Sequence, residues 1–311
     1  MFVDKLIEKI KEKKNPTVVG LDPRINLVPN YIKEEHYNQQ EDKIKAETKA
    51  ILEYNKIIID TIKDIVPCIK PQIAFYEAYG IEGLKVFKET VEYAKNNGLI
   101  IIADIKRGDI GSTAEGYAKA YFGGGFVDVD SVTLNPYLGE DSIIPFTDFC
   151  SQDKGVFILD KTSNKSSKDL QDLEVFNADE ENKIYHIMGH LINKWGSSYI
   201  GSYGYSSVGA VVGATYPEEM KSLRKIMDKA FFLVPGYGAQ GGSAEDVVDA
   251  FNDDGLGAVI NSSRGIIGAY QKKEYQSKYS EREFYLAIRE AALNMRDNIN
   301  KELKKRKKLA W

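Results

Sequence analysis

Eight apolar segments rich in β-branched residues recur along the chain, and most of the gaps between them hold one amphipathic segment of helical length. The apolar segments are TVVGLD (17–22), VPCIKPQ (66–72), LIIIADIK (99–106), DVDSVTLNPY (128–137), GVFILDKTS (155–163), VGAVVGAT (208–215), AFFLVPGYG (230–238) and GAVINSSRG (257–265). Strands that alternate with helices favour parallel βαβ units. Eight such units predict an α/β fold of the closed (β/α)₈ type, the TIM barrel.

Two of the gaps are longer than a single helix requires. Residues 23–65 leave room for extra helix, and residues 164–207 contain a polar stretch, a predicted helix from Glu180 to Trp195 and the sequence GSSYIGSYGYSS. Strands of the same kind resume after both gaps, which is not typical of a linker between domains. We therefore expect residues 1–311 to form a single barrel domain with insertions at about 23–65 and 164–207.

The composition indicates a soluble protein of a reducing compartment. With 43% hydrophobic residues the chain can bury a sizeable core, but its longest apolar stretches, such as residues 99–103, fall far short of the roughly 20 residues that cross a bilayer. The amino-terminal amphipathic segment carries Asp4 and Glu8, which argues against a targeting peptide. Cys68 and Cys150 lack metal-ligand spacing, so we expect buried free thiols. These features predict a cytoplasmic protein that does not bind membranes.

The charge pattern gives no general reason to expect a nucleic-acid partner. The net charge at pH 7 is −4, and only the tail KKRKK (304–308) is strongly basic. That tail follows an amphipathic helical segment, whose C-terminal end favours cations through the helix dipole. We therefore expect no nucleic-acid binding.

Polar side chains follow the predicted strands at the points where the strands end. The carboxyl ends of the strands form one face of a barrel, where the functional groups of this fold gather. We therefore expect these side chains to converge at one mouth. They are Asp22, Lys70, Asp104, Lys106, Ser163, Gln240 and Arg264.

The third of these strands ends in opposite charges. Asp104 and Lys106 are two residues apart, so strand periodicity places their side chains on one face, about 7 Å apart along the strand. Lys70 on the neighbouring strand adds a second cation, and Asp109 adds a second anion. An exposed ion pair at the rim would contribute little to stability, and four alternating charges exceed simple pairing. The pattern predicts a catalytic cluster.

The seventh strand runs into a glycine-rich loop, PGYGAQGGSAEDVVDAF, in which Gly236, Gly238 and Gly241 match G-x-G-x-x-G before a predicted helix. A dinucleotide-binding fold also needs an acidic residue about 20 residues later, but the eighth strand ends in Asn-Ser-Ser at 261–263. The glycines either shape a tight turn or let backbone N–H groups approach a phosphate. In the second case Arg264 would complete the site with its planar fork of donors.

Taken together, these motifs resemble the orotidine 5′-phosphate decarboxylase family in its longer bacterial form. The resemblance covers nearly the whole chain. The pattern D-x-K-x-x-D alone also occurs in a related group of sugar-phosphate aldolases, whereas its combination with Lys70 and the phosphate loop is more specific. The matching segments are VVGLDPR, CIKPQIAFYEAYG, IIADIKRGDIGSTAEGYA, SVTLNPYLG, LVPGYGAQGG and NSSRG.

The resemblance implies an activity and a role for each matching residue. The expected reaction is the decarboxylation of orotidine 5′-monophosphate to UMP, the last step of de novo pyrimidine nucleotide synthesis, by a homodimer with shared active sites and without a cofactor. Lys106 would give the proton to C6 within a charge array of Lys70, Asp104, Lys106 and Asp109, in which Asp109 acts in the neighbouring subunit's site. The implied substrate-binding residues are Asp22 and Lys70 for the ribose, Thr113 across the dimer, Ser163 for the pyrimidine, and Gln240 and Arg264 for the phosphate, with Pro235, Gly236 and Gly241 as further substrate-binding residues.

Two other functions remain open at this point. A Mg²⁺-dependent hexulose-phosphate synthase-like aldolase would want a further carboxylate at the end of the second strand, where this chain has Lys70. A non-catalytic nucleotide-binding barrel would have no need of Lys106 and Asp109. His186 and His190 are four residues apart on a predicted helix, but no acidic third ligand accompanies them, so we expect no metal site.

Overall fold

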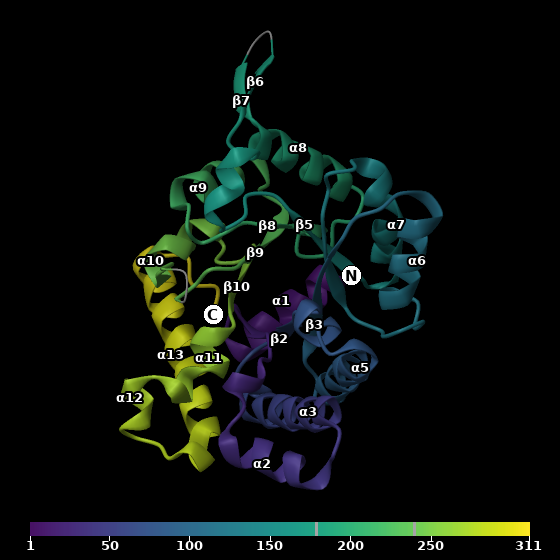
Figure 1. The fold of residues 1–311 in the computed structure, drawn as a ribbon. Helices are drawn as coiled ribbons and strands as arrows, with labels where there is room; N and C mark the ends of the chain where they lie inside the picture. The colour runs from purple at the N-terminus through teal and green to yellow at the C-terminus, as the bar shows by residue number, and fades with distance from the viewer. Residues whose placement is uncertain (178–179, 239–240) are drawn as a thin grey trace.

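The structure is a computed structural model that describes residues 1–177, 180–238 and 241–311. Eight parallel strands close into a barrel in the order β1-β10-β9-β8-β5-β4-β3-β2, which confirms the predicted (β/α)₈ fold (Figure 1). Each of the eight apolar segments supplies one strand. The strands are β1 (Thr17–Leu21), β2 (Cys68–Pro71), β3 (Ile100–Arg107), β4 (Ser131–Leu134), β5 (Gly155–Leu159), β8 (Ser206–Val211), β9 (Ala230–Val234) and β10 (Ala258–Ser262).

Helices form a ring around the barrel, and the larger hydrophobic cluster fills the space between the strands and this ring (Figure 1). The α-helices of the ring and of its loops are α2 (Asn30–Gln39), α3 (Lys43–Ile62), α4 (Ala74–Glu77), α5 (Gly80–Asn96), α6 (Gly111–Phe122), α7 (Ile144–Thr147), α8 (Ile184–Gly196), α9 (Pro217–Ile226), α10 (Ala244–Val247), α11 (Arg264–Ile267), α12 (Lys273–Gln276) and α13 (Phe284–Lys305). Short 3₁₀ turns occupy Ile25–Leu27, Glu140–Ser142, Asp148–Gln152, Lys165–Asp169, Val248–Ala250, Ala269–Gln271 and Glu281–Glu283.

Helix α1 (Phe2–Lys13) closes the amino end of the barrel. Its apolar face, with Phe2 and Leu6 among its buried residues, joins the inward-facing side chains of the strands in a second hydrophobic cluster. The ring of Phe2 meets that of Phe157 edge to face, with 6.2 Å between centroids. Residue 155 has to be glycine for this packing, because a Cβ there would lie 2.1 Å from the Phe2 ring. The opposite, carboxyl end of the barrel is therefore the face left for chemistry.

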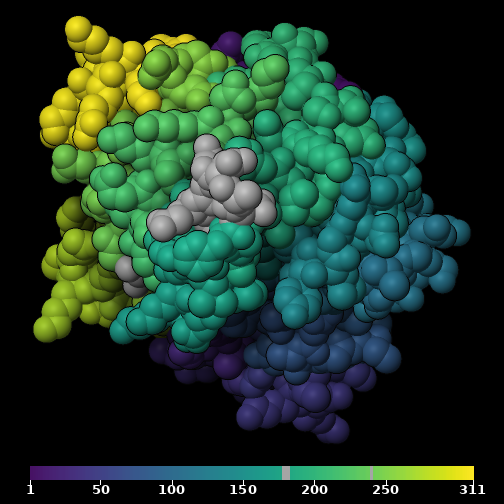
Figure 2. Space-filling model, turned by 90° about the horizontal axis from the view of Figure 1, so that it is seen from above, coloured from purple at the N-terminus to yellow at the C-terminus, as the bar shows by residue number. Residues whose placement is uncertain are grey.

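The long segment 164–207 differs from its prediction at one end. The helix expected from Glu180 begins instead at Ile184, and Glu180–Lys183 form strand β7, which pairs antiparallel with β6 (Glu174–Asn177). The apolar helical repeat starts only at Ile184, whereas the preceding residues are polar and follow the strand-forming pair Val175 and Phe176. The hairpin projects from the ring beside α8 (Figure 1), and Figure 2 views the molecule from that side.

Two further expectations concern membranes and thiols. In the described ranges, no helix has both the length and the apolar character needed to span a bilayer. Cys68 and Cys150 are buried and free, as predicted. Burial raises the pKa of the Cys150 thiol to about 12, so this group stays protonated and unreactive at neutral pH.

Candidate active site

Two adjoining cavities open at the carboxyl end of the barrel, and three residues line both of them. One has a volume of about 490 Å³ and extends from Asp22 on the β1 loop to Arg264 after β10. The other has a volume of about 820 Å³ and extends toward Ser163 on the β5 loop. Lys70, Asp104 and Pro235 line both cavities, so the two form one continuous site around these residues.

The carboxylate of Asp104 lies between two lysines. Lys70 Nζ donates to Asp104 Oδ2 at 2.6 Å, and Lys106 Nζ donates to Asp104 Oδ1 at 2.5 Å. Asp104 and Lys70 are almost fully buried, whereas the Lys106 side chain is 44% exposed. The structure thus brings three of the four predicted array residues together, with the most accessible ammonium group on Lys106.

The electrostatics of this cluster keep the two buried members charged. Burial alone would raise the pKa of Asp104, but the positive charges of Lys70 and Lys106 and their hydrogen bonds outweigh it and hold the pKa well below its usual range. For Lys70, burial would lower the pKa, but Asp104 and Asp22 raise it above its usual value. Carboxylate and ammonium therefore coexist in a nearly dry environment across the neutral pH range.

Strand β3 is irregular where it carries this chemistry. Between the partner pairs Ala103↔Val132 and Arg107↔Leu134, β3 advances from 103 to 107 while β4 advances only from 132 to 134. Lys106 takes a φ of +48°, a left-handed conformation that non-glycine residues seldom adopt. The strand is therefore not regular at this point, although the side chains of Asp104 and Lys106 do meet as predicted. Extra residues in β3 bulge over Thr133, a residue that the sequence analysis did not single out.

Asp109 and Thr113 do not join the site of their own chain. Asp109 follows β3, and its Oδ1 accepts the N–H of Ile110 at 2.8 Å. Thr113 is exposed in the first turn of α6. Neither residue lines the two cavities. Within one chain, the fourth member of the predicted array is therefore separate from the other three.

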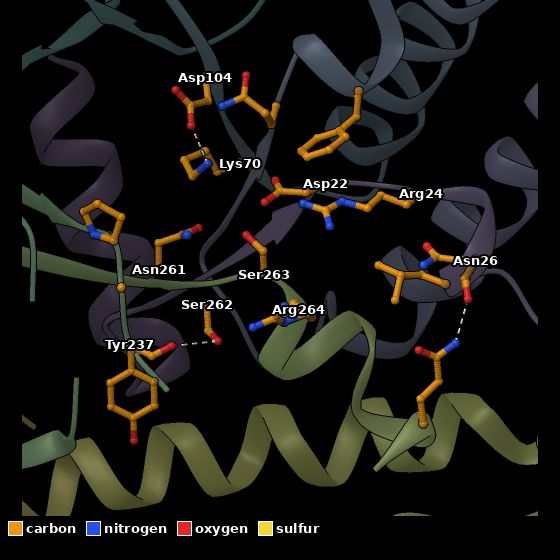
Figure 3. Close-up of a pocket in the computed structure, with 16 residues that line it drawn as sticks. Asp22, Arg24, Asn26, Lys70, Asp104, Tyr237, Asn261, Ser262, Ser263 and Arg264 are labelled. Carbon is orange, nitrogen blue, oxygen red and sulfur yellow. Dashed lines mark hydrogen bonds and ion pairs between the residues drawn. The ribbon is translucent and has the colours of Figure 1, made fainter. Parts of the chain in front are cut away.

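The smaller cavity ends in the predicted phosphate region. Pro235, Gly236 and Arg264 line it together with Arg24, which the sequence analysis missed because it follows the first strand by three residues (Figure 3). The two arginine side chains supply two positive charges to this cavity. Gln240 lies outside the described residues.

The helix predicted after the glycine loop is only one short turn. α10 spans four residues and begins after Ser243, whose hydroxyl accepts the N–H of Asp246. Gly241 has a φ of +96° and donates its N–H to the carbonyl of Gly238 at 3.1 Å, but it does not line either cavity. The positive charge of the phosphate region therefore comes mainly from arginine side chains rather than from a helix dipole.

Two oxygen atoms at the smaller cavity are available to a ligand. Asp22 Oδ1 and Asn261 Oδ1 are buried and have no hydrogen-bond partner among the described residues. Both residues line the cavity, where Figure 3 draws them with Lys70. Because an unsatisfied buried acceptor costs free energy, such a pair favours a bound group that donates hydrogen bonds, such as a sugar hydroxyl.

The loop that carries Ser163 is held by the long segment that follows it. Lys161 is fully buried and donates to Asp172 Oδ1 at 2.5 Å. The backbone N–H of Thr162 donates to Gln171 Oε1 at 3.0 Å, and Gln171 Nε2 donates to Thr162 Oγ1 at 2.9 Å. The start of the 164–207 segment therefore fixes the edge of the larger cavity at which Ser163 lies. These contacts join residues nine and eleven positions apart, so no local sequence pattern reveals them.

His186 contacts a residue of the neighbouring helix. His186 Nε2 lies 3.1 Å from Ser222 Oγ, a contact between α8 and α9. In the part of the chain that the structure describes, no group of three or more His, Cys, Asp or Glu side chains is arranged to hold a metal ion.

The chain is similar to known proteins over nearly its whole length. A family model described as Orotidine 5′-phosphate decarboxylase / HUMPS family matches residues 19–279. The orotidine 5′-phosphate decarboxylase of Petrotoga mobilis is 48% identical over 303 residues, which cover 97% of this chain and 99% of that one. The corresponding protein of Clostridium tetani is 43% identical over 300 residues, 96% and 98% of the two chains. The structure of Leishmania donovani OMP decarboxylase matches with a TM-score of 0.73 at 31% identity, covering 96% and 97%.

Proposed function

Because the chain belongs to the orotidine 5′-phosphate decarboxylase / HUMPS family, we propose that it decarboxylates orotidine 5′-monophosphate to UMP. The observation that carries the proposal is the position of Asp104 between Lys70 and Lys106, where the two cavities meet. The smaller cavity contains Arg24 and Arg264, and the larger one extends to Ser163.

The nucleotide is proposed to lie across both cavities. Arg264 binds the 5′-phosphate with Pro235 and Gly236, and Arg24 adds a second positive charge to the same cavity. Gln240 and Gly241 of the following loop are proposed, from the family resemblance alone, to join this contact. The free oxygen of Asp22 and the ammonium group of Lys70 bind ribose hydroxyls. Ser163 then contacts the pyrimidine from the larger cavity. Binding of the phosphate, far from the reacting carbon, supplies free energy for holding C6 beside Lys106.

The proposed reaction needs only the charges of the site. The bond between C6 and the carboxylate breaks, CO₂ leaves, and the electron pair stays on C6. The ammonium group of Lys106 stabilises this charge and then donates a proton to C6, which gives UMP and a neutral lysine that regains its proton from water. Asp104 holds both lysines in place and faces the departing carboxylate. No cofactor takes part in this scheme.

The active enzyme is proposed to be a homodimer in which Asp109 and Thr113 complete the neighbouring site. Support comes from their position outside the cavities of their own chain. Large apolar side chains are exposed next to them: Ile110 is 52% exposed, and on the neighbouring loop Tyr137 and Leu138 are 78% and 49% exposed. Such a cluster is typical of an interface. We further propose that residues 1–311 act as one domain in the cytoplasm.

The test is a decarboxylation assay with the purified protein. Orotidine 5′-monophosphate is added in excess EDTA, and UMP is measured by chromatography, with the Lys106→Ala variant as control. We expect UMP from the wild-type protein at a rate that EDTA leaves unchanged. Loss of turnover in EDTA, or an absence of UMP together with Mg²⁺-dependent aldol cleavage of a hexulose phosphate, would instead support the aldolase alternative.

A further inference from the structure

We propose that Thr133 on β4 is a positioning residue that sets the place of the Lys106 ammonium group for proton transfer. The inference rests on the proposed decarboxylation and adds a residue to it. It comes from the irregularity of β3, which lies directly opposite Thr133.

The bulge leaves backbone groups of β3 without their usual partners. In a regular parallel ladder the N–H groups of a strand bond to carbonyls of its neighbour, and a bulge interrupts this pattern. Here the N–H groups of Ile105 and Lys106 both donate to Thr133 Oγ1, each at 3.0 Å. The hydroxyl of a side chain therefore replaces the missing backbone acceptor.

The same hydroxyl also binds the acid of the array. Thr133 Oγ1 donates to Asp104 Oδ1 at 2.8 Å, the oxygen that also accepts from Lys106 Nζ. A hydroxyl has one proton and two lone pairs, so these three hydrogen bonds use its full capacity. Thr133 is 1% exposed, which leaves water little access to replace it. One atom thus links the backbone of Lys106 to the carboxylate that holds its amine.

Lys106 needs such a link because its backbone is in an unfavourable conformation. At a φ of +48° the Cβ of an L residue is crowded, so this geometry persists only where surrounding contacts impose it. Without the hydroxyl, the buried N–H of Ile105 and the partly buried N–H of Lys106 would lose this acceptor, and the easiest relief is a shift of residues 105–106. That shift would move the lysine amine relative to C6.

The consequence should fall on the chemical step. Proton transfer is sensitive to displacements of an ångström or less, whereas the phosphate and ribose contacts come from the β1, β2, β9 and β10 ends. Thr133 also lines the larger cavity, but its hydroxyl already makes three hydrogen bonds within the protein, so substrate binding should survive a change at this residue. The hydroxyl itself, rather than the volume of the side chain, should decide the rate.

Thr133→Val keeps the shape of the side chain and removes the hydroxyl, and Thr133→Ser keeps the hydroxyl and removes a methyl group. We expect Thr133→Val to lower kcat about 100-fold with KM changed less than about threefold, and Thr133→Ser to keep kcat within about fivefold of wild type. UMP does not react, so the number of UMP molecules bound per chain at saturation measures the folded fraction of each variant, whereas the affinity for UMP reports on substrate binding. Thr133→Ala gives a second variant without the hydroxyl if the valine protein does not bind UMP.

Three results would overturn the inference: a Thr133→Val kcat within threefold of wild type, an equal loss of kcat in Thr133→Ser, or a loss confined to KM and UMP affinity. Wild-type protein that produces no UMP from orotidine 5′-monophosphate would have a different meaning. It would refute the proposed function, and therefore also the role of Thr133 that depends on it.

Discussion

Lys70 on β2 and Asp104 on β3 form an ion pair with 2.6 Å between Nζ and Oδ2, and their residues are only 4% and 6% exposed. Such a pair contributes little net stability, because burying both charges costs about as much as their attraction returns. Its value lies in holding fixed charge at the meeting point of the two cavities. The second oxygen of Asp104 remains free to hold Lys106, the more exposed lysine.

Removal of the Asp104 charge should destabilise the protein strongly. Asp104→Asn leaves Lys70 buried without a counter-charge, and we expect the free energy of unfolding to fall by about 3–5 kcal/mol at pH 7. The pKa of Asp104 is lowered in the folded state, so this contribution is fully present above its ordinary pKa of 3.8 and is lost gradually as the pH falls from 3.8 toward the lower pKa of the folded protein. Urea unfolding at pH 7 measures the loss of unfolding free energy in Asp104→Asn, and the same measurement at pH 3 tests whether the difference from wild type becomes smaller.

The matched control for this prediction is an exposed ion pair. Lys85 and Glu82 lie 2.7 Å apart on the surface of α5, and Glu82→Gln should cost less than about 1 kcal/mol. If Asp104→Asn and Glu82→Gln had similar costs, Lys70 would not depend on Asp104 for its charge.

A shared active site predicts complementation between two inactive variants. Lys106→Ala lacks the proton donor, and Asp109→Ala lacks the carboxylate proposed for the partner's site, so each alone should be nearly inactive. After subunit exchange, half of the dimers are hybrids with one intact site, which restores about a quarter of the wild-type sites. The decarboxylation rate of the mixture measures the recovery.

Subunit exchange has to be demonstrated independently, for example by native mass spectrometry of differently labelled chains. Exchange without recovery would place Asp109 outside the neighbouring site.

Arg264→Ala should weaken binding of the UMP phosphate and leave the contacts to the base intact. Hydrogen bonds to a charged partner contribute about 1.5–3 kcal/mol, so the affinity for UMP should fall between about 10-fold and 150-fold. Uridine, which has no phosphate, should bind both proteins equally weakly. Isothermal titration with both ligands makes the comparison, and an equal loss for uridine would point to a general distortion instead.

The same titration of Arg24→Ala compares the second arginine of this cavity. We expect a smaller loss of UMP affinity, because the Arg24 guanidinium also lies over the Phe75 ring, 4.9 Å from its centroid.

Asp160 should make stability depend on pH in the opposite direction to Asp104. It is 3% exposed, and neither of its carboxylate oxygens has a hydrogen-bond partner among the residues described. Burial raises its pKa well above 3.8, and Lys161 offsets only part of this. Between 3.8 and the raised pKa the folded protein keeps a proton that the unfolded chain has lost, so stability falls by about 1.4 kcal/mol for each pH unit.

Asp160→Asn removes this dependence at nearly constant volume. The variant should gain stability relative to wild type as the pH rises above 4, up to the raised pKa of Asp160, as measured by thermal unfolding at several pH values. Asp253→Asn, at a fully exposed side chain, is the matched control and should follow the wild-type curve. Parallel curves for Asp160→Asn and wild type would show that the carboxyl has the same charge in the folded and unfolded protein.

The sequence was sufficient for the barrel because the signals of its strands and helices are local. An apolar run such as Ile100–Ala103 indicates a strand, and an amphipathic run such as α5 indicates a helix. The alternation of such runs predicts the parallel topology. The barrel mouth then brings Lys70, Asp104 and Lys106 together, since strand ends share one face.

What the sequence could not provide depends on relations between segments. The bulge in β3 is a matter of register against β4, and neither the φ of Lys106 nor the three bonds of Thr133 leaves a local pattern. The hairpin before α8 was missed for a similar reason, because Glu180–Lys183 become a strand only by pairing with β6. Asp109 and Thr113 depend on a second chain, so their roles remain predictions.

Phe2 and the rest of the apolar face of α1 fill the amino end of the barrel. Substrate therefore enters, and products leave, at the carboxyl end. In the proposed reaction CO₂ is small enough to escape past a nucleotide that is still bound at its phosphate. UMP has to dissociate through the same opening before the next substrate molecule can bind. Product inhibition by UMP should therefore be competitive, and the dwell time of UMP limits how fast the enzyme can cycle.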